Sequence, residues 1–143
     1  MYKQTLVWDK VVQGLNYQNY AHQFELIIFC IKGEEYHPKR LKNKTDVIRC
    51  QRVNGNNKIN HETVKPIRLF RDIIEDNSNV GDVVLDCFLG SGTTAIACKQ
   101  TNRNFIGCEI SQEYCDIAEG YLQQTSLFPQ KKKNILDFKE VSP

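Results

Sequence analysis

The stretch that decides the fold is Val83-Val84-Leu85-Asp86-Cys87-Phe88-Leu89-Gly90-Ser91-Gly92-Thr93-Thr94. An apolar run ends in an acid, a pair of glycines follows, and small residues come next. This order predicts a strand that ends at Asp86, a tight turn at the glycines, and a helix that begins near Thr93. Glycines in such a turn let the polar end of a ligand approach bare backbone. We therefore expect an α/β fold with a ligand site at the end of this strand.

A second acid follows at the end of the next predicted strand. Glu109 lies 19 residues after Gly90 and closes the run Phe105-Ile106-Gly107-Cys108. In a βαβ unit, an acid at about this distance accepts hydrogen bonds from ribose hydroxyls. The two acids together predict an adenosine-containing cofactor.

Two other nucleotide sites are disfavoured. A triphosphate-binding loop needs a lysine after its second glycine, and none follows Gly92. A dinucleotide fingerprint needs a third glycine where Ala95 stands, which also disfavours a nucleotide-binding oxidoreductase. An acid just before the turn repels a pyrophosphate and suits a cationic amino-acid end, such as that of S-adenosylmethionine. A plain glycine turn without a ligand is the alternative, and Asp86 and Glu109 weigh against it.

Three segments resemble the DNA amino-methyltransferases of the N6-adenine and N4-cytosine type. Residues 86–94 resemble motif I, D-P-F-x-G-S-G-T-T, and residues 61–66 resemble the segment H-P-T-Q-K-P that directly precedes it. Residues 105–109 resemble F-I-G-x-E. The resemblance spans residues 5–122 in the order of the β group, with departures at Glu62, Val64 and Cys87.

The resemblance implies a Rossmann-like S-adenosylmethionine-dependent methyltransferase fold. Asp86 would contact the cofactor's ammonium group, with helix capping as the alternative, and Glu109 would bind its ribose. For Thr63, a role as helix cap is as well supported as cofactor contact. For Phe88, packing in the core is as well supported as lining the cofactor pocket. The cofactor-binding residues implied are Thr63, Lys65, Asp86, Phe88, Gly90, Ser91, Gly92, Thr93 and Glu109.

The family's catalytic tetrapeptide, [DNS]-P-P-[YFW], is missing. No two of the four prolines, Pro38, Pro66, Pro129 and Pro143, are adjacent. In the β group this motif comes before the segment that Met1 opens, so the chain resembles the C-terminal portion of a methyltransferase. The motif's strand lies beside the strand of Asp86 in the family. We therefore expect an incomplete fold without its central strands and without a catalytic residue.

The resemblance implies a DNA methyltransferase of restriction-modification type that acts on adenine N6 or cytosine N4, with adenine favoured, in double-stranded DNA. Two alternatives remain open. The chain is a non-catalytic remnant, or it is one subunit of a split enzyme. In the second case the tetrapeptide comes from a complementary methyltransferase subunit, and a homodimer is also open. The isolated chain is expected to be inactive.

The 143 residues predict one partial domain over 1–124, with a short insert at 33–60 and a polar tail at 125–143. The net charge of +2 does not argue for nucleic acid. Basic residues nevertheless gather in the insert, where the family carries target recognition. Two interpretations of these residues are equally supported: a solvated loop, and contacts with DNA phosphates. The candidates for nucleic-acid binding are Lys39, Arg40, Lys42, Lys44, Arg49 and Arg52.

Local patterns predict the other elements. Residues 5–9 and 24–31 are expected to be strands, the second one buried. A helix is expected after Pro66, with an apolar stripe at Ile67, Phe70, Ile73 and Ile74. A further helix is expected after Ser111 as its cap, with an apolar face at Tyr114, Ile117, Ala118, Tyr121 and Leu122.

Six cysteines show no metal-ligand spacing, which predicts no metal. Cys30, Cys98 and Cys108 lie in apolar runs and are expected to be reduced, buried thiols in a cytoplasmic protein. No membrane-length apolar run occurs.

The segment Gln124–Phe128 resembles Q-L-[SD]-L-F, the peptide that docks on the bacterial sliding clamp. Thr125 departs from that pattern. The alternative is that Leu127 and Phe128 fold back on the domain itself.

Overall fold

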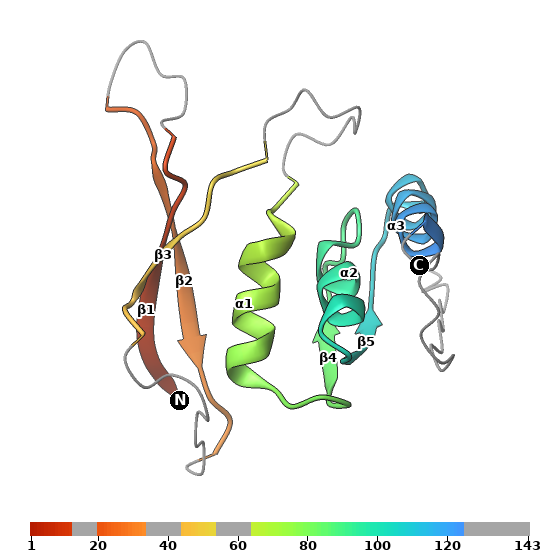
Figure 1. The fold of residues 1–143 in the computed structure, drawn as a ribbon, viewed down its shortest axis with the longest axis horizontal. Helices are drawn as coiled ribbons and strands as arrows, with labels where there is room; N and C mark the ends of the chain where they lie inside the picture. Colours follow the sequence, from red (N-terminus) through yellow and green to blue (C-terminus); the bar gives the residue numbers. More distant parts are fainter. Residues whose placement is uncertain (13–19, 34–43, 54–63, 125–143) are drawn as a thin grey trace. The chain divides into compact units, whose positions relative to one another are not determined.

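The computed structural model describes residues 1–12, 20–33, 44–53 and 64–124. The chain forms two compact units, Met1–Asn60 and His61–Pro143. The single partial domain over 1–124 therefore stays a prediction. None of the helices in the described ranges is long and apolar enough to cross a membrane. The elements, in chain order, are β1 (Tyr2–Asp9), β2 (Phe24–Cys30), β3 (Val47–Arg49), α1 (Ile67–Asn77), β4 (Val83–Asp86), α2 (Thr93–Gln100), β5 (Asn104–Gly107) and α3 (Gln112–Gln124) (Figure 1).

The first unit holds a sheet in the order β2-β1-β3. The two strands predicted over 5–9 and 24–31 are confirmed, and they pair antiparallel as β1 and β2. Strand β3 was not predicted, since it lies inside the segment expected to be a loop or small insert. It pairs parallel with β1, and the Cys50 N–H donates to the carbonyl of Asp9 at 3.0 Å. Backbone hydrogen bonds can place even a short polar segment in a sheet. The polar residues around Val47 and Ile48 therefore predicted a loop, although this segment forms a strand.

A buried tryptophan ties two strands of this unit together. The Trp8 side chain is buried, and its Nε1–H donates to the Cys50 carbonyl at 2.6 Å. The Lys10 ammonium lies 5.6 Å from the centre of the Trp8 ring and pairs with the Glu25 carboxylate at 2.8 Å. The end of β1 is thereby fixed against the residues that follow β3.

Strand β2 is buried on one face only. Phe24, Leu26 and Ile28 are exposed, and the residues between them are half-buried. The expectation of a buried strand is therefore wrong for this face, and so is the expectation of a buried thiol at Cys30. An apolar run without alternation predicts a strand covered on both sides, and nothing in the described residues covers the second side of β2.

The second unit is an α/β layer built on two parallel strands. β4 and β5 pair in register, with Leu85 opposite Ile106. One face of this sheet packs on the helices, where Val84 and Phe105 contact the cluster formed by Ile74, Ala97 and Cys98. Helix α2 lies between α1 and α3 (Figure 1). The α/β prediction is confirmed, with the helices of the described residues on one side of the sheet.

The helix predictions are confirmed with small differences. In α1, Ile74 is buried as expected, but Leu69 is the most buried residue and was not in the predicted stripe. Pro66 precedes α1 in extended conformation without a side-chain cap, and Thr63 lies outside the described residues. At α3, the Ser111 hydroxyl accepts a hydrogen bond from the Tyr114 N–H at 3.4 Å, as a capping residue does.

Two long basic side chains join the elements of the second unit. The buried Arg103 guanidinium donates to the Ser78 hydroxyl at 3.1 Å, to the Ser78 carbonyl at 2.8 Å and to the Thr101 carbonyl at 2.6 Å. The Lys99 ammonium donates to the Leu122 carbonyl at 2.7 Å, near the end of α3. These bonds hold the end of α1 and the end of α3 against the layer that carries β4 and β5.

Candidate functional site

The two predicted acids lie at the same edge of the sheet. Asp86 ends β4 opposite Gly107, the last residue of β5, and Glu109 follows two residues later. The carboxyl ends of parallel strands are where ligands bind in α/β folds. The predicted pair of acids is thus brought together at the edge where such a site is expected.

The glycine turn between β4 and α2 is tightly held. The Leu89 N–H donates to the Cys108 carbonyl at 2.8 Å, and the Gly92 N–H donates to the Leu89 carbonyl at 3.1 Å. Gly92 has a φ of 88°, and a Cβ there would lie 2.8 Å from the Cβ of Ala118. Both the positive φ and the contact with α3 require glycine. The turn therefore packs closely against α3, at the edge that carries the two acids.

Asp86 is oriented toward this turn. Its Oδ2 accepts a hydrogen bond from the Thr94 hydroxyl at 2.5 Å, and its Oδ1 accepts one from the Phe88 N–H at 3.0 Å. These two bonds fix the carboxylate beside the start of α2. A fixed carboxylate at this edge suits a cationic group of a ligand.

Glu109 fastens the turn to the start of α3. Its Oε2 accepts from the Gly90 N–H at 2.8 Å, and its Oε1 accepts from the N–H groups of Ile110 and Ser111, both at 2.9 Å. Sequence reasoning gave Glu109 a ligand role and missed this structural one. An acid a few residues before a helix is the signal for the bonds from Ile110 and Ser111, because backbone N–H groups in the segment that leads into α3 at Gln112 need acceptors.

The remaining predicted cofactor residues fall into three groups. Phe88 is 90% exposed, so the core-packing alternative is wrong and its ring is open to a ligand. Ser91 and Thr93 are buried, and the Thr93 hydroxyl donates to the Lys65 carbonyl at 3.4 Å, which brings Lys65 to the start of α2. Thr63 lies outside the described residues.

Two thiols flank the edge of the sheet. Cys87 and Cys108 are exposed, so the expectation of a buried thiol at Cys108 is wrong. Cys98 is buried in α2 as expected, and burial raises the pKa of its thiol to about 11. Burial also raises the pKa of the Cys115 thiol.

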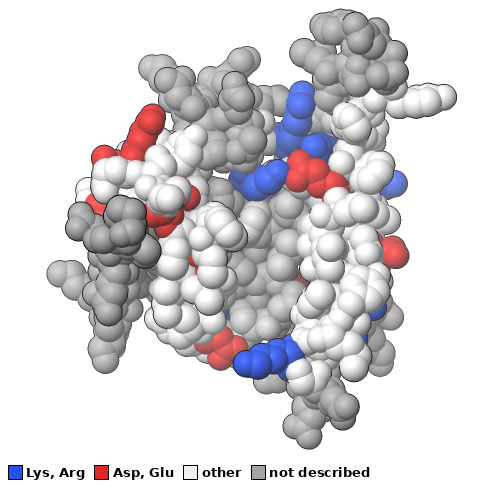
Figure 2. Space-filling view, turned by 180° about the vertical axis from the view of Figure 1, so that it is seen from behind, with Lys and Arg blue, Asp and Glu red and all other residues white. Residues whose placement is uncertain are grey.

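The candidate nucleic-acid residues are only partly described. Lys39, Arg40 and Lys42 lie outside the described residues, whereas Lys44, Arg49 and Arg52 are exposed. Figure 2 shows Lys and Arg side chains in blue and Asp and Glu side chains in red among the described residues of one face.

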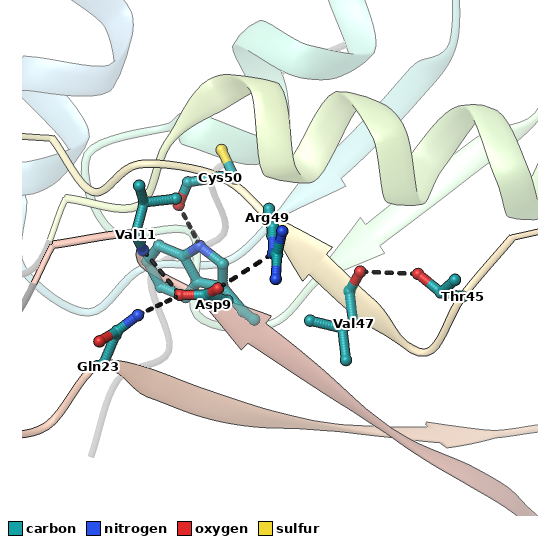
Figure 3. A network of polar contacts seen from close by, with 8 residues as sticks. Asp9, Val11, Gln23, Thr45, Val47, Arg49 and Cys50 are labelled. Carbon is teal, nitrogen blue, oxygen red and sulfur yellow. Dashed lines mark hydrogen bonds and ion pairs between the residues drawn. The ribbon is translucent and has the colours of Figure 1, made fainter.

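Arg49 has an acidic neighbour. Its Nε lies 3.4 Å from Oδ2 of Asp9, whose Oδ1 accepts from the Val11 N–H at 2.9 Å and from the Gln23 amide at 3.1 Å (Figure 3). The Val11 bond, followed by that of Gln23, lowers the pKa of Asp9. The charge of Arg49 is thus partly balanced within the first unit.

Comparison with known proteins places the chain in a family. The model of the N6/N4 DNA methylases, described as DNA methylase, matches residues 1–120. The chain belongs to the DNA methylase family. Among the methylases to which it is similar is the type II methyltransferase M1.MboII of Moraxella bovis. The two are 44% identical over 96 residues, which is 66% of this chain and 35% of the relative. The chain therefore spans about a third of this curated methylase.

Solved methylase structures share the fold. The M1.HpyAVI–SAM complex is 31% identical, with a TM-score of 0.65, over 85% of this chain and 62% of that one. The cytosine-N4-specific PvuII methyltransferase shares the fold with a TM-score of 0.68 at 15% identity, over 81% of this chain and 49% of that one. The fold is thus that of the S-adenosylmethionine-dependent DNA methyltransferases. It is incomplete, as the sequence predicts.

Proposed function

We propose that this chain supplies the S-adenosylmethionine-binding part of a DNA amino-methyltransferase. The observation that carries the proposal is the placement of Asp86 and Glu109 on either side of the glycine turn, at one edge of the parallel pair. The residues fit this cofactor. A carboxylate suits its ammonium group, a second carboxylate suits its ribose hydroxyls, and the 90% exposed Phe88 ring offers an apolar surface.

Bound S-adenosylmethionine would supply an electrophilic methyl group for an exocyclic nitrogen of DNA, adenine N6 in preference to cytosine N4. The residues of this chain would hold the cofactor in one orientation. Asp86 would bind the ammonium group, Glu109 would accept from the ribose, and the backbone at Gly90 would permit close approach, while Gly92 lets the turn pack on α3. Alignment of this kind is the protein's contribution to a direct transfer.

The residues that would orient the target amine must come from polypeptide outside these 143 residues, because the sequence holds no adjacent prolines. A complementary methyltransferase subunit carrying the tetrapeptide would make the chain half of a split enzyme, and a homodimer would not supply that motif. The alternative is a non-catalytic remnant that binds the cofactor alone. Double-stranded DNA as substrate, phosphate contacts by Lys44, Arg49 and Arg52, and clamp docking through Gln124–Phe128 stay predictions.

Calorimetric titration of the chain with S-adenosylhomocysteine, the demethylated cofactor, tests the proposal. Weak but saturable binding is expected. Asp86→Asn keeps an oxygen that can accept from the Phe88 N–H and places an amide N–H that can donate to the Thr94 hydroxyl, but it removes the charge, so it should weaken binding by roughly 1–3 kcal/mol. Asp82→Asn is the matched control, because Asp82 sits at the other end of β4 and accepts from the Asn79 N–H at 2.7 Å. Equal binding by both variants would remove Asp86 from the site.

Glu109→Gln tests the ribose contact in the same titration. It should weaken binding by roughly 1–3 kcal/mol, since a lost charged hydrogen bond costs that much. Glu113→Gln, in the exposed first turn of α3, is the control and should bind as the unmodified chain does. Far-UV circular dichroism of Glu109→Gln separates a lost ligand contact from a displaced turn.

A further inference from the structure

A buried threonine at the start of α2 bonds directly to one of the two acids. Thr94 is 4% exposed and was not among the predicted cofactor-binding residues. Its hydroxyl donates to Oδ2 of Asp86 at 2.5 Å. The hydroxyl of the neighbouring Thr93 donates instead to the Lys65 carbonyl. The two threonines thus have different partners, and Thr94 is the one that bonds the acid.

Thr94 completes a hold on both oxygens of the Asp86 carboxylate. Oδ1 accepts from the Phe88 N–H at 3.0 Å, and Oδ2 accepts from the Thr94 hydroxyl. The χ2 torsion of an aspartate is broad, so bonds from outside the side chain must set it. One bond at one oxygen leaves the other oxygen free to turn. The second bond, from a different element, removes that freedom.

The helix that carries this hydroxyl is itself fixed against β4. Ala97 and Cys98 of α2 are 0% exposed, and Val84 of β4 packs against the cluster that contains them. Branching at Cβ also restricts the χ1 torsion of Thr94. A stiff donor on a packed helix therefore points at the end of the strand that packs on the same helix.

The Asp86 carboxylate keeps room and charge for a ligand. An ionised carboxylate has about four lone-pair positions for hydrogen bonds, and the two bonds described here use two of them. Both donors, the Phe88 N–H and the Thr94 hydroxyl, are uncharged. They fix the direction of the carboxylate without pairing its charge. A group that is already oriented loses less entropy when a ligand binds.

We propose that Thr94 is a positioning residue for the amino-acid end of the cofactor. It acts through Asp86, whose carboxylate it holds in one orientation. The proposal rests on the proposed function, which assigns the ammonium group to Asp86. It goes further by naming the residue that sets the direction of this carboxylate. The competing explanation is that the bond only stabilises the turn between β4 and α2.

Calorimetric titration of the full 143-residue chain with S-adenosylhomocysteine tests the proposal. Thr94→Val keeps the size and branching of the side chain and removes its hydroxyl. It should weaken binding by at least about fivefold, because the ligand must then order the carboxylate itself. Thr94→Ser keeps the hydroxyl and should bind within about twofold of the unmodified chain. Circular dichroism checks the fold, and Thr94→Ala replaces Thr94→Val in every comparison if the valine variant is unfolded.

Thr101→Val is the matched control at the other end of α2. Thr101 is also 4% exposed, and its hydroxyl donates to the Ala97 carbonyl at 2.8 Å. The same atoms are removed from the same helix, so urea denaturation should show a loss of stability in both valine variants. Cofactor binding by Thr101→Val should stay within about twofold of the unmodified chain. A folded Thr94→Val that binds as tightly as Thr101→Val would overturn the proposal.

A double-mutant cycle decides whether Thr94 acts through Asp86. Asp86→Ala removes the carboxylate, so Thr94→Val should change binding by less than about twofold in that background. If the loss is as large with Asp86→Ala as without it, Thr94 supports the turn independently of Asp86 and the proposal is rejected.

The titration of the unmodified chain separates this proposal from the proposed function. If the unmodified chain binds S-adenosylhomocysteine and Thr94→Val binds it equally well, the positioning role alone is rejected. If the unmodified chain shows no binding at about 1 mM ligand, Asp86 has no ammonium group to hold, and both proposals are rejected.

Discussion

Glu109 has two roles at the residue scale, one shown in its hydrogen bonds and one proposed. Its carboxylate accepts from the N–H groups of Gly90, Ile110 and Ser111. The motif spacing predicted an acid at this edge but could not predict the bond from Gly90. That bond depends on how closely the turn after β4 approaches Glu109, and residues far apart in sequence set that distance.

The thiols give a prediction at the same scale. In the native chain, iodoacetamide should modify the exposed Cys30, Cys87 and Cys108 and spare Cys98, whose thiol is buried with a pKa raised to about 11. S-adenosylhomocysteine should slow modification of Cys87, because Cys87 directly follows Asp86. Cys30, in the other unit, is the control and should react at the same rate with and without ligand. Peptide mass spectrometry measures each rate, and equal slowing at both cysteines would contradict a local site.

At the scale of the element, the turn between β4 and α2 was predictable and strand β3 was not. Paired glycines after an apolar run are a strong local signal, whereas Val47 and Ile48 join a sheet only because β1 offers them a free edge. The burial of β2 and of Cys108 was mispredicted for a related reason. An apolar pattern reports which faces a complete domain covers, and among the described residues one face of each sheet keeps exposed apolar side chains.

Gly92 supports a prediction about the turn itself. Gly92→Ala should destabilise the chain more than Gly81→Ala, although both glycines have a φ of 88°. A left-handed conformation costs each alanine about 1–2 kcal/mol. At Gly92 the added Cβ also meets the Cβ of Ala118 at 2.8 Å, whereas at Gly81 it meets nothing within 4 Å. Overpacking should add roughly 1–3 kcal/mol. Urea denaturation followed by circular dichroism measures the free energy of unfolding of both variants. Equal losses of stability would show that α3 moves aside to accommodate the added methyl group.

At the scale of the whole molecule, the sequence predicted an incomplete methylase, and the fold and the comparisons agree with this. The order of the motifs carried that prediction, because each is short but their succession is specific. The division into two compact units was not predictable. It follows from which strands are present, and the missing middle of the sheet leaves no strand in the described residues to join β1–β3 with β4 and β5.

The chain alone is expected to transfer no methyl group to DNA. It lacks the residues that orient the target amine, so cofactor binding by itself leaves the acceptor unplaced. A tritium-transfer assay with unmethylated duplex DNA measures this, with an intact N6/N4 methyltransferase as the positive control. Sustained turnover by the pure chain would show that other residues of these 143 perform that task.

The Trp8 indole, which donates to the Cys50 carbonyl, gives a fluorescence signal that reports on the first unit alone. Trp8 is the only tryptophan in the sequence, and both bonded residues belong to the first unit. All helices of the described residues belong to the second unit. Indole emission therefore follows the β-structure of residues 1–60, while ellipticity at the helical band follows the second unit. If indole emission and helical ellipticity change at different denaturant concentrations, the two units unfold separately. If they change together, the chain unfolds as one cooperative unit.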